Sequence, residues 1–492
     1  MTFPMARVCL RIVIGLLGVA WAGVRAAAPV ERIAVDCGRE TGRIRAIHGV
    51  NGGPVSNGEN PDLRGWFQEA GFATARLHDC HWPCPDAVDI HTVFPLAHLD
   101  PDDPANYTFA KTDAYLRGIV DSGVGIVYRL GESIETKGTR YHITPPRDLD
   151  AFARVCVNIV RHCNEGWADG HRFGIRYWEI WNEPDVDLMW TGTKEEFLAL
   201  YETVARAVEA HDPALKVGGP GFSDVNDKPE GWARVFLARC RDRKLPLDFF
   251  TFHRYGNDVA GIVEKVRLVR RLLDEYGFEK TEIHLNEFRY MPAGSWQGIR
   301  PRDPEKYVGV PAVFEQSTGA AGAAHAVSTL AALQDEPVAM TNYYSGDTSP
   351  WSMFGQFGIR RPVYHAYRAF NEVAKRPRRA AVAVEAAAPV DAVVAGQGTT
   401  SLRSAALAGV ADDGRSVAVV VSTFGCGAGA REVTIGGLPW AGASRVETLL
   451  VDDTHPLTET PATVEQAAGR VTVAVDLPAD RVCLVRVTPA AM

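Results

Sequence analysis

Asn182-Glu183 and Asn286-Glu287 each end a short apolar run, in "IRYWEIWNE" and "EIHLNE". A carboxylate that follows an apolar run is costly to bury unless a partner stabilises it. Two carboxylates that face each other about 5 Å apart can cleave a glycosidic bond, one as proton donor and the other as nucleophile. The pair Glu183 and Glu287 therefore predicts a hydrolase that uses two carboxylic acids.

Asn-Glu-Pro on its own is also a common turn signal, because Pro184 cannot continue a strand. The second Asn-Glu, at the end of another strand-like run, favours an active site over a turn. In this interpretation Asn182 hydrogen-bonds a sugar hydroxyl beside the scissile bond. Glu179 lies on the same side of its strand as Glu183 but deeper, so we expect it to be a buried structural partner of Arg76.

Further polar residues end other apolar runs. Arg76, His78 and Asp79 end "FATARLHD", and His253 and Tyr255 lie near the end of "DFFTFHRYG". If these runs are parallel strands of one barrel, their carboxyl ends meet on one face, where barrel enzymes form their active sites. These residues are therefore candidate substrate contacts, although a buried histidine such as His78 is also common in a core.

The elements that must position these residues alternate between short apolar runs and helical patterns. The predicted strands span residues 43–52, 72–79, 124–132, 175–183, 215–221, 248–256, 282–288 and 338–345. The stretches between them include residues 194–211, where apolar residues recur at helical spacing. Eight strand-helix units predict a (β/α)8 TIM barrel over residues 43–375. An open doubly wound sheet is the alternative, but it should carry a G-x-G-x-x-G loop, which "GVNGGPVSNG" does not match.

Helical patterns stop after about residue 376, and short strands with turn residues follow, among them "RSVAVVVSTF", "GRVTVAVDLP" and "DRVCLVRVTP". This pattern predicts a C-terminal all-β sandwich domain over residues 376–492. The segment 29–42 is also strand-like, and we expect it to pair with the sandwich.

Residues 1–28 have the pattern of a signal peptide. Arg7 and Arg11 precede an apolar run over residues 12–24, and the small residues Ala26 and Ala28 follow. A retained membrane anchor is the alternative, but the run is short for a membrane span. We therefore expect a secreted or periplasmic protein that has no membrane contact after cleavage.

The composition is that of a globular protein with two or three domains. The chain has 492 residues, of which 46% are hydrophobic and 23% charged. The net charge is −8 and no basic run stands out, which argues against nucleic acid as a partner. The oligomeric state stays open.

Nine cysteines are present, and Cys9 lies in the signal segment. Export permits disulfides, so Cys80 and Cys84 in "HDCHWPCP" are a candidate pair. Zinc is the alternative there, but the usual paired spacing of zinc ligands is missing. Cys156 and Cys163 lie seven residues apart on a predicted helix, too far to bridge, and we expect them to be core thiols.

Together, "WEIWNEPD", "FFTFHRYG" and "IHLNEF" resemble glycoside hydrolase family 39, within a clan of retaining (β/α)8 glycosidases. "IHGVNGGP" and "ARLHD" also look like this family. The resemblance implies that Glu183 is the acid/base, with a raised pKa that keeps it protonated at the start. It implies that Glu287 is the nucleophile and that Asn182 contacts the sugar 2-hydroxyl.

The same resemblance implies roles for three more residues. Tyr255 would hydrogen-bond the nucleophile, and His253 would lie near the sugar ring. Arg76 would lie beneath the nucleophile and help keep it ionised, because a nearby cation lowers the pKa of a carboxylate. The chemistry requires neither a cofactor nor a metal.

The sequence departs from the family pattern after the nucleophile, in "FRYMPAGSW". Arg289 and Trp296 are therefore expected to influence substrate preference. Glu132 is expected either to line the pocket or to cap a helix, and Glu135 to be a cap or exposed. Several aromatic residues near strand ends are either core residues or platforms for sugar rings, and Trp351 is the strongest candidate platform: Trp82, Trp190, Tyr343, Tyr344 and Trp351.

These residues predict an exported retaining glycosidase that acts on an oligo- or polysaccharide. By resemblance the leading substrate is a β-xyloside of plant-type glycans, cleaved by exo action. The alternatives are an α-L-iduronide, an arabinoside, a galactoside, or endo action on a longer chain. An iduronidase needs a cation for the substrate carboxylate, and Arg289 is the candidate. An alternative of another class is a carbohydrate-binding protein without activity.

Overall fold

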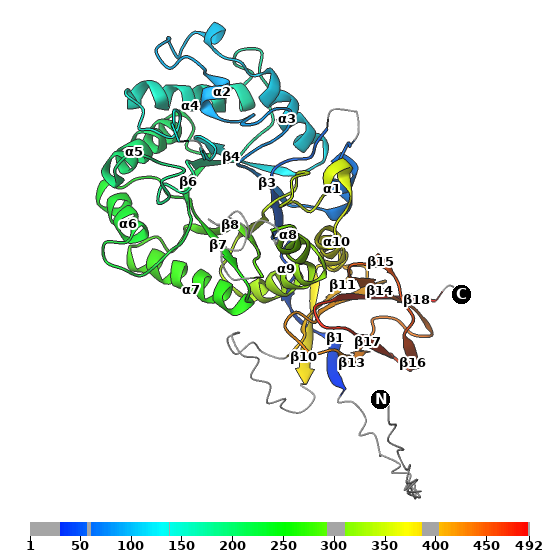
Figure 1. Cartoon of the computed structure of the whole chain (residues 1–492). Helices are drawn as coiled ribbons and strands as arrows, with labels where there is room; N and C mark the ends of the chain where they lie inside the picture. The colour runs from blue at the N-terminus through cyan, green and yellow to red at the C-terminus, as the bar shows by residue number, and fades with distance from the viewer. Residues whose placement is uncertain (1–29, 57–60, 137, 293–309, 386–402, 491–492) are drawn as a thin grey trace, which may run out of the picture.

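A computed structural model describes residues 30–56, 61–136, 138–292, 310–385 and 403–490. The chain forms a barrel and an all-β domain that lie side by side (Figure 1). The predicted signal segment lies outside the described residues. Within the described ranges, no helix combines the length and the apolar character that a membrane span needs.

The barrel consists of eight parallel strands that close on themselves. They are β2 (His48–Asn51), β3 (Thr74–Leu77), β4 (Gly125–Leu130), β5 (Tyr177–Ile180), β6 (Lys216–Phe222), β7 (Phe249–Gly256), β8 (Glu282–Tyr290) and β9 (Met340–Tyr343). Each overlaps one of the eight predicted strands, so the predicted TIM barrel is confirmed and the open doubly wound sheet is excluded. Most of their residues are buried, as expected for parallel strands covered on both faces.

Helices form the outer ring around these strands (Figure 1). They are α1 (Arg64–Ala70), α2 (Ile90–Val93), α3 (Ala110–Asp121), α4 (Leu149–Asn164), α5 (Lys194–His211), α6 (Trp232–Arg243), α7 (Val259–Glu275), α8 (Val310–Thr318), α9 (Ala320–Ala332) and α10 (Pro362–Ala374). α5 shows why such segments are helical. Thr193 and Glu196 form a capping box at its start, and Phe197, Tyr201 and Val204 are buried along one face.

The C-terminal domain is a ten-stranded sheet in the order β15-β14-β18-β12-β11-β10-β1-β13-β17-β16. Its strands are β1 (Glu31–Arg43), β10 (Arg378–Glu385), β11 (Ala405–Val410), β12 (Val417–Ser422), β13 (Gly429–Gly436), β14 (Ser444–Val451), β15 (Pro456–Glu459), β16 (Thr463–Ala467), β17 (Arg470–Leu477) and β18 (Val482–Pro489). Val419 on one half and Val473 on the other belong to the same buried core, so the sheet folds over on itself. The predicted all-β domain is therefore present, with its two layers joined by continuous strand pairing.

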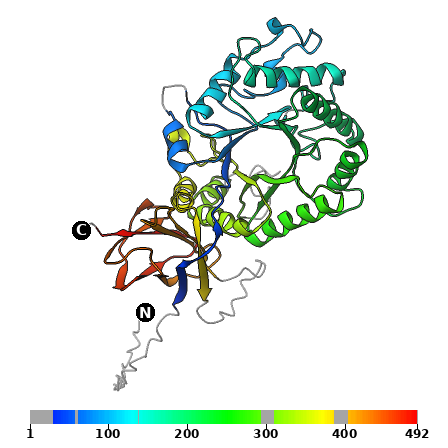
Figure 2. The ribbon, with the colours of Figure 1, turned by 180° about the vertical axis from the view of Figure 1, so that it is seen from behind.

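The N-terminal strand β1 lies inside this domain, antiparallel to β10 and parallel to β13. The domain packs against α9 and α10, which lie between it and the barrel (Figure 2). Ser422 on β12 donates a hydrogen bond of 2.8 Å to the carbonyl of Ala324 on α9. Leu407 and Val420 join the apolar core of the barrel, so the all-β domain supports the helices that follow β8 and β9.

Every cysteine among the described residues is a free thiol. Cys80 and Cys84 therefore do not form the disulfide that their spacing made possible. Cys156 and Cys163 are buried on α4, as predicted for core thiols.

Candidate active site

A cavity of about 330 Å³ lies at the carboxyl ends of the barrel strands. Its walls come from residues in or just after β3, β5, β7, β8 and β9 and from nearby loops: His78, Asp79, Ile134, Glu183, Val186, Leu188, Met189, Ser223, Tyr255, Glu287, Tyr344 and Trp351. A larger groove of about 830 Å³ lies between α4 and α5 on the outer surface, away from the strand ends. The smaller cavity is therefore the candidate site, because both predicted glutamates line it.

The chain turns sharply between β5 and Glu183. The predicted strand runs to Glu183, but β5 ends at Ile180. Trp181 has φ 70° and Glu183 has φ 43°, left-handed conformations that are unfavourable for residues other than glycine. Surrounding bonds fix this turn: Trp181 Nε1 donates to the Met189 carbonyl at 2.9 Å, and the Glu183 N–H donates to the Gly221 carbonyl at 3.0 Å. The turn aims Glu183 into the cavity.

Arg76 lies beneath the cavity and is fully buried. Its guanidinium donates to Glu179 Oε2 at 2.6 Å, to Glu287 Oε1 at 2.7 Å and to Asn182 Oδ1 at 2.6 Å. A fourth bond of 3.2 Å reaches Asn51 Oδ1. One rigid cation thus fixes both a structural and a candidate catalytic carboxylate, and Glu179 takes the position expected for a partner of Arg76.

The second Asn-Glu pair does not repeat the arrangement of the first. Asn286 Nδ2 donates to Glu179 Oε1 at 2.6 Å, so Asn286 holds the buried carboxylate. Asn51 Nδ2 in turn donates to the Asn286 carbonyl at 2.7 Å. Asn51 was not among the predicted site residues, although its position at the end of the first barrel strand, in "GVNGG", was a usable signal.

Glu287 lies on β8 with its side chain only 5% exposed. The Tyr255 hydroxyl donates to Glu287 Oε2. Burial raises the pKa of Glu287, although the Arg76 guanidinium opposes the rise. Arg76 therefore lies beneath Glu287 as predicted, and its charge favours the ionised form of that carboxylate. Burial has the larger effect on the pKa of Glu287.

His253 joins the two glutamates. Its Nδ1 lies 2.7 Å from Glu183 Oε1 and 3.4 Å from Glu287 Oε2. Burial lowers the pKa of His253 to about 4, so the imidazole is neutral at neutral pH. Ligand atoms of Glu183, His253 and Glu287 all lie within 4.8 Å of one another, so a carboxylate oxygen of Glu183 is within that distance of one of Glu287. These side chains are also close enough to hold a cation, which two-carboxylate hydrolysis does not require.

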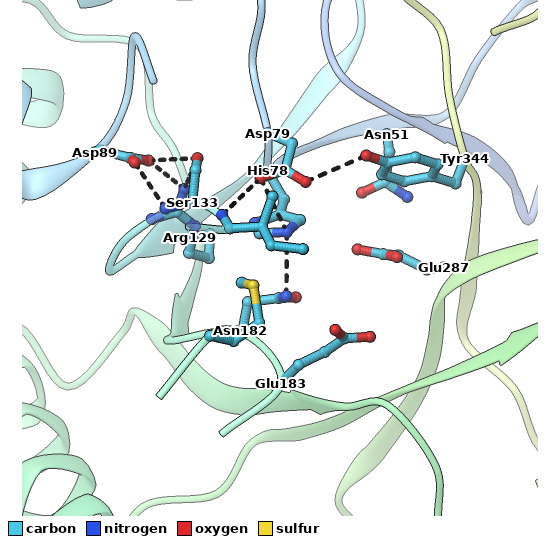
Figure 3. Close-up of polar contacts among 12 residues, drawn as sticks. Asn51, His78, Asp79, Asp89, Arg129, Ser133, Asn182, Glu183, Glu287 and Tyr344 are labelled. Carbon is cyan, nitrogen blue, oxygen red and sulfur yellow. Dashed lines mark hydrogen bonds and ion pairs between the residues drawn. The ribbon is translucent and has the colours of Figure 1, made fainter. Parts of the chain in front are cut away.

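The opposite wall carries His78, Asp79 and Tyr344 (Figure 3). Asn182 Nδ2 lies 3.1 Å from His78 Nε2. Asp79 accepts a bond of 3.1 Å from the Ile134 N–H and one of 3.3 Å from the Tyr344 hydroxyl. Burial raises the pKa of Asp79. His78 and Asp79 thus present polar atoms to the same cavity as the glutamates.

A supporting cluster of Asp89, Arg129 and Ser133 lies behind that wall; none of the three was among the predicted site residues. Asp89 Oδ2 accepts from the Ser133 N–H at 2.7 Å, and Asp89 Oδ1 accepts from the Arg129 guanidinium at 2.5 Å (Figure 3). Ser133 precedes Ile134, so this cluster fixes the backbone that holds Asp79.

The structure places Arg289 and Glu132 behind the cavity wall. Arg289 is fully buried, donates to the Trp351 carbonyl at 2.9 Å and lies 4.9 Å from the centroid of the Trp351 ring. It supports Trp351, which lines the cavity, and is not itself a wall residue. Glu132 is buried behind the site, where its Oε2 lies 2.5 Å from His91 Nδ1 and its Oε1 accepts a bond of 3.1 Å from the His91 N–H. His91 lies in the first turn of α2, so Glu132 has the helix-capping role, one of the two expected for it. Glu135 accepts backbone N–H bonds from a loop, including one of 2.9 Å from His142.

The remaining aromatic candidates divide between core and cavity. Tyr344 lines the cavity, whereas Trp190 and Tyr343 are buried in the core. Trp82 packs against Tyr115 with ring centroids 6.3 Å apart. Trp296 lies outside the described residues.

Gly221 offers a test of this packing. It has φ 64°, and a Cβ placed there would lie 3.0 Å from Asn182 Oδ1, 3.1 Å from Arg76 Nη2 and 3.2 Å from His253 Nε2. We expect Gly221→Ala to displace these groups and to lower kcat/KM for an aryl glycoside by about 10- to 100-fold. The matched control is Gly174→Ala, because Gly174 has φ 67° and open space around it. The control should lose about 1 kcal/mol of unfolding free energy and keep its kcat/KM. Equal kcat/KM values for the two variants would contradict the packing described.

Comparison with known proteins agrees with this geometry. Residues 61–408 match the profile of glycosyl hydrolases family 39. A β-xylosidase of Geobacillus stearothermophilus is 31% identical over 171 residues, which cover 30% of this chain and 32% of that enzyme. Human α-L-iduronidase is 28% identical over 137 residues, 24% of this chain and 20% of that protein. The chain therefore matches only a third or less of the length of these relatives.

A solved structure of a glucosidase from Croceicoccus marinus matches over nearly the whole chain. It covers 94% of this chain and 100% of its own, with a TM-score of 0.77 and 25% identity. The family profile covers more than half of this chain, including both glutamates. The chain thus belongs to glycosyl hydrolases family 39.

Proposed function

We propose that this enzyme is a retaining glycosidase in which Glu287 is the nucleophile and Glu183 the acid/base. The observation that carries the proposal is the short separation of the two carboxylates, whose oxygens lie within 4.8 Å of each other. A retaining enzyme needs carboxyl groups about 5 Å apart, whereas an inverting enzyme needs about 6.5 Å or more to admit a water. The short separation therefore favours the retaining mechanism.

In the first step Glu287 attacks the anomeric carbon, and the bond to the leaving oxygen breaks as Glu183 gives that oxygen its proton. The bonds from Arg76 and Tyr255 hold Glu287 in one orientation. Glu183 is the more accessible carboxylate, with its side chain 19% exposed against 5% for Glu287. This difference suits a group that must exchange protons with solvent.

In the second step a water attacks the glycosyl-enzyme, Glu183 takes its proton, and Glu287 leaves as a carboxylate. Neutral His253 suits both states of Glu183. It donates its Nδ1–H to an ionised Glu183, and as the other tautomer it accepts a hydrogen bond from a protonated one. His253 is therefore a positioning residue in both steps.

Asn182 is proposed to hold the sugar 2-hydroxyl. Its Oδ1 accepts from Arg76 and its Nδ2 contacts His78, so the amide is fixed while one N–H remains for substrate. His78 and Asp79 are proposed contacts for other hydroxyls. Trp351 and Tyr344 offer aromatic faces in the same cavity.

The proposed substrate is a β-xyloside of plant-type glycans, cleaved by exo action. The xylosidase relative supports it, as does a cavity of only about 330 Å³. A β-glucoside is the second candidate, because the glucosidase structure covers nearly the whole chain. An α-L-iduronide is less favoured, since Arg289, the candidate cation, contacts Trp351 and does not line the cavity.

The proposal that the enzyme is exported rests on the signal-like residues 1–28.

Removal of each carboxylate tests the mechanism. Glu287→Gly should lower kcat for aryl glycosides by about 10⁴-fold or more, and azide should restore turnover with a glycosyl azide of inverted configuration. Glu183→Ala with azide should instead give the retained azide. The matched control is Glu282→Gly, at the opposite end of β8, which should keep its activity. Full activity of Glu287→Gly, or a retained azide from it, would refute the assignment.

A panel of aryl glycosides tests the sugar separately. We expect the highest kcat/KM for the β-D-xyloside among the β-xyloside, β-glucoside, α-L-arabinofuranoside, β-galactoside and α-L-iduronide. The measurement is initial rates with purified enzyme. A higher value for the β-glucoside would replace the xyloside proposal and leave the retaining mechanism intact.

A further inference from the structure

Three side chains that can bind a metal lie together outside the catalytic cavity. They are Asp113 on α3, His162 on α4 and His171 in the loop after α4. Ligand atoms from the three residues lie within 4.8 Å of one another. His162 Nε2 is 2.9 Å from Asp113 Oδ1, and His171 Nε2 is 3.2 Å from Asp113 Oδ2.

Hydrogen bonding places a lone pair of His162 inside this cluster. His162 Nδ1 lies 2.9 Å from the Trp167 carbonyl, which only accepts, so Nδ1 carries the proton. Nε2 of a neutral His162 then points its lone pair at a carboxylate oxygen, which also only accepts. The contact requires a positive charge between them, either a second proton or a metal ion.

His171 places a second ring nitrogen beside the same carboxylate. His171 Nε2 is buried and makes no hydrogen bond of acceptable geometry, although it faces the other oxygen of Asp113. The His162 and His171 rings are nearly perpendicular, at 81°, with centroids 5.6 Å apart. Two imidazole nitrogens and a carboxylate therefore converge on one point.

We propose that Asp113, His162 and His171 bind one Zn²⁺ ion. Imidazole and carboxylate are common zinc ligands, and ligands about 2.0–2.1 Å from a tetrahedral ion are roughly 3.3 Å apart. The separations of 2.9 and 3.2 Å are close to that value. The Trp167 carbonyl acts as the outer partner that fixes the tautomer of a zinc-bound histidine. A water completes the fourth position.

The loop after α4 brings His171 close to His162 and Asp113. A Cβ at Gly170 would lie 2.2 Å from the His162 carbonyl, so only glycine lets the loop pass against the end of α4. The His171 N–H then donates to the same carbonyl at 2.6 Å. Phe109 stacks on the His162 ring with centroids 3.5 Å apart.

The ion would join α3, α4 and the loop that leads into β5. None of the three ligands lines the catalytic cavity, so the role is structural. Metal that binds only the native state stabilises it by mass action.

Zinc titration of the tag-free full-length protein tests this site. After treatment with a chelator, calorimetric titration with ZnCl₂ should give one equivalent of bound zinc more in the wild type than in Asp113→Asn, a nearly isosteric variant. His171→Ala should lose the same equivalent. Zinc should raise the Tm of the wild type and leave that of both variants unchanged, with native folding checked by circular dichroism.

The matched control is His211→Ala. His211 contacts a carboxylate, with Nε2 2.6 Å from Glu165 Oε1, but no second imidazole joins that pair among the described metal-ligand clusters. It should bind zinc like the wild type. Equal zinc stoichiometry in the wild type and Asp113→Asn, or no zinc uptake by the wild type, would overturn the proposal.

Discussion

The buried guanidinium of Arg76 is the interaction on which the rest of the site depends. It is shared by Glu179 and Glu287, and it also fixes Asn182 and Asn51. Removing one partner from a buried ion pair typically costs about 3–5 kcal/mol, because the remaining charge is left uncompensated. Arginine suits this position better than lysine, since its rigid fork serves several acceptors at once. Burial raises the pKa of Glu287, and the Arg76 guanidinium opposes that rise.

The barrel makes this interaction possible by bringing distant parts of the sequence together. Arg76 lies on β3, Glu179 on β5 and Glu287 on β8, and only a closed sheet places these strands around one point. The all-β domain contributes indirectly. It packs against α9, which contacts β8, the strand that carries Glu287. The all-β domain thus supports, through α9, the strand that carries the proposed nucleophile.

The sequence was sufficient to predict the barrel and the two glutamates, because parallel strands leave apolar runs and the carboxylates stand at the ends of two of them. It also predicted the pairing of Arg76 with Glu179, through the alternation along the strand. The turn at Trp181 and Glu183 was not predictable, since left-handed backbone at these residues is imposed by tertiary bonds. Arg289 was expected to influence substrate preference, but its side chain instead contacts Trp351. That contact was not predictable either, because Trp351 follows Arg289 by 62 positions in the sequence.

The central claim is that Glu287 forms a covalent bond to the sugar. The most direct measurement uses an activated 2-deoxy-2-fluoro glycoside of the best substrate, which slows the second step and accumulates the glycosyl-enzyme. Peptide mass spectrometry should then find the fluorosugar on Glu287, in one equivalent per chain. A fluorosugar attached to Glu183 or to another residue, or hydrolysis of the reagent with no adduct at all, would contradict the account.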